Sequence, residues 1–411
     1  MIRRDPRSES RAPIQLRLVH LSDLHLGFRQ YQRQTPLGHN QREADVASSF
    51  RYALDKTIEL RPDLVVIGGD VFHNVRPTNP AIITAFRQFA RLRAELPEAT
   101  LVMVAGNHDL PRAAETGCIL ALFRDLGITV VDREAQRLDF PERDLSILAV
   151  PDAPGPRPAL LPEAGYRYNV LLLHGEVQGM LPEHLAHVDR SQVEITADEL
   201  GAARWSYVAL GHYHVYRQIA PNAYYSGSID YTSANPWGEL YEERQAAIAG
   251  KGLIEHDLES GRHAFHHIPP SRRLIDLPAV SARGLSVAEI DDRIRGAIAS
   301  CDGGIEEKIV RLVVRELPRH VARELDHKAL REYKRRALHF QLDTRRPEIA
   351  RAHGHASPGR RPSLADVVRE KLASRVLESD LDRAALIDLG LRYLHEAETA
   401  TATAAPALLE G

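Results

Sequence analysis

The sequence has very little cysteine and no long apolar run. Only Cys118 and Cys301 occur among 411 residues. They are too few and too far apart for a disulfide framework, which favours a reducing compartment. No stretch approaches the roughly 18 apolar residues of a membrane-spanning helix, and the Arg-rich start has no apolar segment of signal-peptide length. We therefore expect a cytoplasmic protein without a membrane segment.

Net charge is also nearly absent, at −3, but the charges are unevenly distributed. Residues 308–362 contain fifteen Lys or Arg and six Asp or Glu. Such a run is either a solvated helix face or a surface that follows a phosphate backbone. The composition, 44% hydrophobic and 27% charged, is that of a globular protein, and the length predicts two or more folded units.

Up to about residue 270, apolar runs alternate with segments of helical period. Strand, helix, strand, helix, strand with continuously apolar strands predicts a sheet that is buried on both faces. The strands of this sheet are expected at 16–23, 63–70 and 100–109, with helices near 41–60 and 80–95. Later runs with shorter connections predict a second, more antiparallel sheet, at 128–132, 145–152, 168–176 and 206–214.

The remainder divides into smaller segments. Residues 273–346 read strand, helix, strand, helix, strand, which predicts a small second domain that carries much of the positive charge. Residues 347–362 are rich in Pro, Gly and His without periodicity, which indicates a linker. The two ends, 1–15 and 397–411, are expected to be disordered.

Residues 363–396 contain two short amphipathic helices. Ser363 begins a capping box with Asp366. The first helix has one apolar face, formed by Leu364, Val367, Val368, Leu372 and Val376. Two such helices bury little against each other, so we expect them to dock on another surface.

Polar side chains of metal-ligand type stand at the ends of five apolar runs. They are Asp23 and His25 in SDLHLG, Asp70 in GGDVFH, Asn107 and His108 in GNHD, His174 in LLLHGE, and His212 and His214 in GHYH. Each alone has an ordinary structural explanation, such as a turn, a helix cap or a satisfied buried histidine. Five independent explanations of that kind are improbable. The strand ends are also where chemistry gathers in α/β folds.

The ligand types indicate the kind of metal. Carboxylate, imidazole and amide oxygen without thiolate suit Mn²⁺, Fe or Zn²⁺ rather than a structural zinc site. Even seven of these eight side chains exceed what one ion takes while keeping a reactive position. Two ions that share one carboxylate would use them all, and a pair about 3.5 to 4 Å apart suits phosphoryl displacement.

The order D-x-H, G-D-x-x-[HD], G-N-H-[DE], His before Gly, and G-H-x-H resembles the motif set of calcineurin-like metallophosphoesterases. Within that superfamily, SDLHLG, GDVFHN and GNHDLP are similar to the SbcD-type double-strand-break repair nucleases. The resemblance implies an α/β fold, a two-sheet sandwich flanked by helices over 16–272. It also implies a small α+β capping domain that binds DNA at 273–346 and a helix pair at 363–396 that docks a partner ATPase.

The resemblance also implies roles for single residues. One ion, expected to be Mn²⁺, would be held by Asp23, His25, Asp70 and His214. A second Mn²⁺ would be held by Asp70, Asn107, His174 and His212, with Fe, Zn or Mg as other possible metals. His108 would face the scissile phosphate and protonate the leaving oxygen. His73 stands where protein Ser/Thr phosphatases have Asp, which suits a phosphodiester, and Asp109 is expected to be orienting or structural.

The resemblance implies a metal-dependent DNA exonuclease or endonuclease of double-strand-break repair. It would act in the cytoplasm, associated with the nucleoid, as a homodimer in complex with an SbcC-like SMC-family ATPase. A phosphodiesterase for small or cyclic nucleotides remains open, although it would have no use for the basic second domain. A non-catalytic DNA tether would not need all seven ligands. The other histidines are expected at the surface, including His263, His266, His267, His353 and His355.

Overall fold

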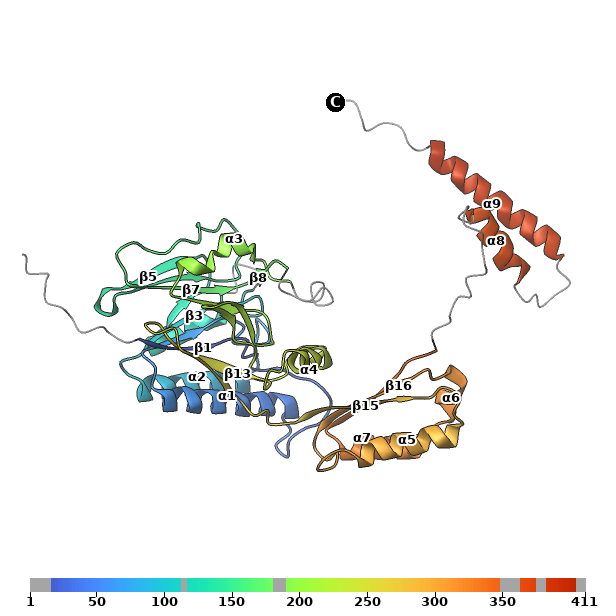
Figure 1. Ribbon diagram of the computed structural model, residues 1–411, viewed down its shortest axis with the longest axis horizontal. Coiled ribbons are helices and arrows are strands. Elements are labelled where there is room, and N and C mark those ends of the chain that lie inside the picture. Colours follow the sequence, from blue (N-terminus) through green and yellow to red (C-terminus); the bar gives the residue numbers. More distant parts are fainter. Residues whose placement is uncertain (1–15, 112–116, 180–189, 348–362, 375–381, 404–411) are drawn as a thin grey trace, which may run out of the picture. The chain divides into compact units, whose positions relative to one another are not determined.

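The computed structural model describes residues 16–111, 117–179, 190–347, 363–374 and 382–403. The chain divides into two compact units, Met1–Pro347 and Glu348–Gly411. The first unit contains two six-stranded sheets, a three-stranded sheet and a two-stranded sheet (Figure 1). The expected arm at 1–15, nearly all of the expected linker, and Val376 lie outside the described residues. The expected boundary at residue 272 falls inside the first unit and stays a prediction.

The first sheet has a parallel centre and an antiparallel edge. Its strands, in spatial order, are β14 (His263–His267), β13 (Gly252–Asp257), β1 (Arg17–Leu21), β2 (Leu64–Ile67), β3 (Thr100–Val104) and β4 (Thr129–Val131). The helices α1 (Gln41–Leu60) and α2 (Asn79–Glu95) cover one face of this sheet (Figure 1). Asn40 and Thr78 cap these helices by accepting backbone N–H bonds. The helices and the first three strands that the sequence predicts are confirmed.

The second sheet corrects one expectation. Its order is β11 (Arg217–Ala220), β12 (Ala223–Tyr225), β10 (Tyr207–Gly211), β7 (Tyr168–His174), β6 (Leu145–Val150) and β5 (Gln136–Phe140). Three of its neighbouring pairs are parallel and two are antiparallel, as in the first sheet, so the prediction of a more antiparallel sheet was wrong. The connections after β6 and β7 are long enough to return the chain to the same edge. The run near 129 belongs to the first sheet instead.

The two sheets pack face to face over an apolar core. Fully buried side chains from both sheets form it, among them Leu18, Val66, Val104, Val170, Leu172 and Ala209. A second core fills the space between the first sheet and its helices, with Phe50 and Phe89 fully buried. Because β1 and β2 are buried on both faces, their sequences are continuously apolar.

Short elements lie in the sequence between the strands of the two large sheets. They are η2 (Ile119–Leu126), η3 (Pro141–Arg143), β8 (Glu176–Val177), β9 (Glu194–Ile195), α3 (Ala197–Leu200) and η4 (Ala202–Arg204). The helix α4 (Pro236–Gln245) follows the second sheet and precedes β13. Glu239 and Glu243 of α4 are buried, which is unusual for carboxylates and requires charged partners.

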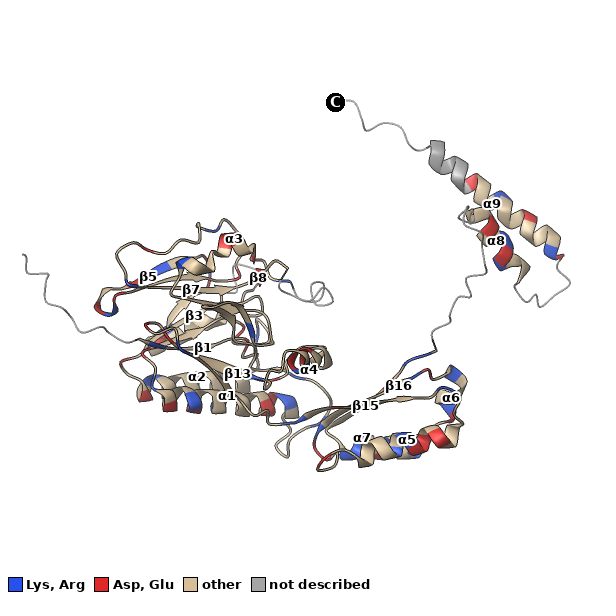
Figure 2. Ribbon diagram, viewed as in Figure 1, with Lys and Arg blue, Asp and Glu red and all other residues tan. Residues whose placement is uncertain are grey.

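The three-stranded region, residues 274–344, follows β14. Its elements are β15 (Leu274–Ser281), α5 (Val287–Ala299), β16 (Ile309–Arg315), α6 (Arg319–Glu324), α7 (His327–Arg336) and β17 (His339–Thr344). All its strands are parallel, so the expected α+β description is corrected to α/β. Helices connect the successive strands and return the chain to the same edge each time. Lys and Arg occur along α6 and α7 (Figure 2).

Trp237 of α4 joins the three-stranded region to the larger sheets. Its Nε1 donates to Oε1 of Gln341 at 3.0 Å, and the guanidinium carbon of Arg311 lies 4.9 Å from its ring centroid. Trp237 is also buried among apolar residues of that region, with Leu274 and Ile309. These contacts keep α4 against the three-stranded region.

The second unit contains the helix pair, α8 (Leu364–Ala373) and α9 (Arg383–Thr403). The predicted capping box of Ser363 and Asp366 is confirmed. Leu372 lies in the contact between the helices, because a Cβ at Gly390 would lie 2.6 Å from its Cδ1. Leu364 and Tyr393 are 59% and 65% exposed. Among the described helices of the whole chain, none has both the length and the apolar character to cross a membrane.

Candidate metal centre

Polar residues at the ends of five parallel strands meet at one place. They belong to the turns after β1, β2 and β3 of the first sheet and to the ends of β7 and β10 of the second. Two groups of three ligand atoms, each within 4.8 Å of one another, contain Asp23, His25 and His214 in one case and Asp70, His174 and His212 in the other. Every predicted metal ligand except Asn107 is therefore in one of these groups.

In the first group, two imidazoles point at each other. Nε2 of His25 lies 2.9 Å from Nε2 of His214, although 189 residues separate them. Oδ2 of Asp70 lies 3.7 Å from Nε2 of His25. Asp23 accepts a hydrogen bond from the backbone N–H of His212, which ties the turn after β1 to the end of β10.

Beside the second group, Asn107 presents an amide oxygen. Its Oδ1 lies 3.1 Å from Nε2 of His174 and 3.3 Å from Nδ1 of His212. Oδ2 of Asp70 is 3.6 Å from the same nitrogen of His174. One oxygen of Asp70 is thus close to both groups, which is the geometry that a bridging carboxylate requires.

The backbone at these ligands is strained. Asp23, His25, Asp70 and His212 all have positive φ, at 52°, 45°, 50° and 102°. A non-glycine residue in such a conformation costs on the order of 1 to 3 kcal/mol, and such residues cluster at functional sites. The surrounding packing holds these four residues in the strained conformation, in which their side chains converge.

Gly106 leaves the space that Asp70 occupies. A Cβ at Gly106 would lie 2.1 Å from Oδ1 of Asp70. Oδ1 of Asp70 accepts the backbone N–H of His108 at 2.9 Å. The glycine in GNHD is therefore required by the close approach of the Asp70 carboxylate.

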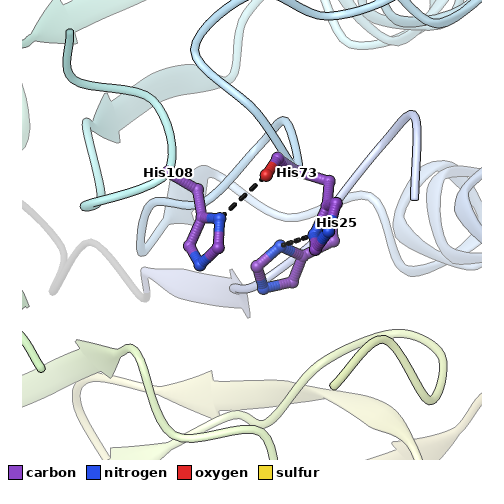
Figure 3. Close-up of side chains that lie close together, drawn as sticks. All are labelled: His25, His73 and His108. Atoms are coloured by element: carbon purple, nitrogen blue, oxygen red, sulfur yellow. Dashed lines mark hydrogen bonds between the residues drawn. The ribbon is translucent and has the colours of Figure 1, made fainter. Parts of the chain in front are cut away.

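His73 and His108 lie beside the first group. Nδ1 of His108 lies 2.8 Å from the carbonyl oxygen of His73, and Nδ1 of His73 lies 3.4 Å from Nδ1 of His25. Dashed lines mark both contacts in Figure 3. Because a carbonyl can only accept, Nδ1 of His108 carries the proton. His25, His73 and His108 form a third group of possible ligands.

The electrostatics of the centre suit cations. Burial lowers the pKa of His25 well below its usual value, and His214 and His108 lower it further, so this ring is neutral, the form in which imidazole binds metals. Burial raises the pKa of the Asp70 carboxyl, against the opposing effect of His174 and His108. Buried carboxylates need compensating positive charge. The donor set therefore fits divalent metal ions.

Asp109 connects two of the turns. It is fully buried and accepts backbone N–H bonds from Val71, Phe72 and Gly106 at 3.2, 3.0 and 3.0 Å. Burial, and then the neighbouring Asp70, raise its pKa to about 7. These contacts hold the turn after β2 against the turn after β3.

Two carboxylates near the centre were not predicted from the sequence. Oε1 of Glu176 lies 3.0 Å from Nε2 of His212, and Oε1 of Glu239 lies 3.4 Å from Nδ1 of His214. Glu176 lies two residues after His174 in the LLLHGE run, so its position in the sequence could have identified it. Glu239 lies on α4, where no sequence pattern marked it.

Residues 16–247 match the sequence model of the Calcineurin-like phosphoesterase family. Because this match covers more than half of the chain, the chain belongs to that family, and its two sheets have the corresponding α/β fold.

Among its relatives are archaeal proteins named DNA double-strand break repair protein Mre11. The Methanocaldococcus jannaschii protein is 26% identical over 249 residues, which are 57% of this chain and 60% of the relative. The Thermoplasma acidophilum protein is 27% identical over 258 residues, 59% of this chain and 62% of the relative. The Methanococcus maripaludis protein is 33% identical over 111 residues, 27% of this chain and 28% of the relative. The matches thus span less than two thirds of each relative.

Proposed function

We propose that this protein is a metal-dependent DNA nuclease that acts in double-strand-break repair. The observation that carries the proposal is the pair of ligand groups around Asp70, with His73 and His108 beside them. The relatives that are named as break-repair proteins support DNA as the substrate.

In this proposal, Asp23, His25, Asp70 and His214 hold one ion. Asp70, Asn107, His174 and His212 hold the other. We propose Mn²⁺ for both, since the oxygen and imidazole donors suit it. Two bound ions would supply an activated water and neutralise the charge on the phosphate.

His108 and His73 contact the phosphodiester in this scheme. The bond from Nδ1 of His108 to the His73 carbonyl fixes the His108 ring. As an imidazolium, His108 would donate from Nε2 to the phosphate and protonate the leaving oxygen. His73 would contact the same phosphodiester, and Asp109 would orient both turns.

Asp70→Ala and His108→Asn test these assignments. Asp70→Ala should lose both ions and all cleavage. His108→Asn should keep its metal content, measured by elemental analysis, and lose cleavage by a factor on the order of 10² or more. An Asp70→Ala variant that retained two ions would contradict the bridging role, and a His108→Asn variant without metal would make His108 a ligand.

The three-stranded region is the proposed DNA-binding surface. Between residues 308 and 347 there are twelve Lys or Arg and five Asp or Glu. Lys328 and Lys334 of α7 are exposed. Replacing both by Glu should weaken cleavage of a DNA duplex, and reduce its salt dependence, while leaving hydrolysis of bis(p-nitrophenyl) phosphate unchanged. If the variant lost the same fraction of activity on both substrates, or lost none on either, a small-nucleotide phosphodiesterase would be favoured.

We further propose that the helix pair docks an SMC-family ATPase, in a complex that holds two copies of this chain. The exposed apolar side chains Leu364, Val367, Leu389 and Tyr393 support a docking role. No side chain in the described part of the helix pair is fully buried. Two helices that bury so little of their apolar surface against each other need a partner surface to bury the rest.

A further inference from the structure

The two histidines of GHYH each have a carboxylate on the side away from the metal ligands. Nδ1 of His212 faces Asn107 at 3.3 Å, while its Nε2 lies 3.0 Å from Glu176. His214 has the opposite orientation, with Nε2 at 2.9 Å from His25 and Nδ1 at 3.4 Å from Glu239. Each ring is therefore between one ligand group and one carboxylate.

Glu176 is held by Ser191 as well as by His212. Its Oε1 also accepts the backbone N–H of Ser191 at 3.0 Å. The hydroxyl of Ser191 donates to Oδ1 of Asp152 at 2.7 Å. Glu176 thus has a fixed position before it meets His212, and its side chain is only 14% exposed.

Glu239 is held more firmly, by a buried lysine. Oε2 of Glu239 pairs with Nζ of Lys251, which also lies 3.1 Å from Glu243 and donates to the carbonyl of His214 at 2.8 Å. Glu239, Glu243 and Lys251 are each at most 3% exposed. Two carboxylates and one ammonium carry a net negative charge, which favours a cation on the far side of the His214 ring.

We propose that Glu176 and Glu239 are positioning residues of the metal centre, each orienting one histidine of GHYH towards a different ion. This inference rests on the proposed metal-dependent function. A carboxylate behind a histidine ligand fixes the tautomer, so the other ring nitrogen keeps its lone pair for the metal. Glu176 is within hydrogen-bond distance of Nε2 of His212, which leaves Nδ1 as the ligand atom. The negative charge of Glu239, at 3.4 Å, favours the proton on Nδ1 of His214 and leaves Nε2 as the ligand atom.

The expected consequence is a loss of metal affinity at one site per carboxylate. Removing such an outer partner weakens metal binding by about 10- to 100-fold. Glu176→Ala should weaken the site that contains His212, and Glu239→Ala the site that contains His214. Glu176→Gln and Glu239→Gln keep an oxygen acceptor and should lose less affinity than the Ala variants.

The test is calorimetric titration of the full chain with Mn²⁺, in a double-mutant cycle with the histidines. Adding Glu176→Ala to His212→Ala should cost no further affinity, and the same should hold for Glu239→Ala in His214→Ala. The matched control is Glu255→Gln, since Glu255 pairs with His266 at 2.9 Å on the antiparallel edge of the first sheet. This control should bind Mn²⁺ as the wild type does.

Other outcomes would overturn different claims. If the wild type binds Mn²⁺ and the Glu variants bind it equally well, or if the losses add to those of the histidine variants, the positioning role is refuted. If the wild type binds no Mn²⁺, the metal centre itself is refuted. Glu239→Ala leaves Lys251 without its closest partner, so its stability is compared in chelator. Glu239→Ala is also compared with the double variant Glu239→Ala/Lys251→Met. If the double variant regains the Mn²⁺ affinity that Glu239→Ala loses, Glu239 acts in folding alone.

Discussion

His20 of β1 is a buried histidine outside the metal centre. It is fully buried between the sheets, and its Nδ1 lies 3.2 Å from the hydroxyl of Tyr207. Burial lowers its pKa to about 3, with a smaller opposing effect from the Leu210 backbone. The folded chain therefore keeps this ring neutral at pH values where the unfolded chain protonates it.

The sign and size of the effect follow from proton linkage. Below the unfolded pKa of about 6.5, the unfolded state binds a proton that the folded state does not, so stability falls as the pH falls. With a folded pKa of about 3, the loss at pH 4.5 is about 2.7 kcal/mol relative to pH 7.5. His20→Leu should lack this part of the pH dependence.

Equilibrium urea unfolding in chelator, followed by tryptophan fluorescence, measures the difference. Between pH 7.5 and 4.5 the wild type should lose about 2.7 kcal/mol more stability than His20→Leu. His20→Leu is less stable at both pH values, because the Tyr207 hydroxyl loses its partner. The exposed His39 provides a control, since His39→Gln should follow the wild type. If the free energies of unfolding of the wild type and of His20→Leu fell by the same amount between pH 7.5 and 4.5, the reasoning would be refuted.

Three further predictions concern the centre and the helix pair. Gly106→Ala should prevent metal binding in titrations, because the new Cβ would occupy the place of the Asp70 carboxylate. Chelation should lower the melting temperature, and excess Mn²⁺ should restore it. At a hundred times Kd, the bound metal adds about 2.7 kcal/mol to the free energy of unfolding. An unchanged melting temperature would contradict the metal centre. Val367→Asp with Tyr393→Asp should weaken ATPase binding more than a hundredfold. Unchanged binding would place the docking surface elsewhere.

The convergence of the candidate ligands was predictable because each motif is local. Asp23 and His25, like His212 and His214, are two residues apart, and each pair follows an apolar run. Parallel strands bring their carboxyl ends to one edge, so residue type and position along the strand were sufficient. The pairing of strands was less predictable, because an apolar run does not encode its neighbour. The segment 129–131 accordingly joined the sheet to which it had not been assigned.

Contacts made by tertiary packing left no local pattern. Glu239 lies on a helix that only the fold brings to His214. His263 was expected at the surface, but its half-buried ring stacks on Tyr224 at 4.1 Å and accepts or donates to Tyr216 at 2.8 Å. His353 and His355 lie outside the described residues. In each described case the partner is distant in sequence, so composition and periodicity could not reveal it.

The positions of the candidate ligands along the chain determine when the centre can form during folding. Asp23, His25, Asp70 and Asn107 come from the first sheet, whereas the remaining ligands come from strands that begin after residue 167. The pair formed by His25 and His214 closes a separation of 189 residues. Contacts of such long range form after local structure, because the entropy of closing the chain must first be overcome. A nascent chain that has only reached β4 therefore presents half a centre to metal ions, and the complete site is a product of finished folding.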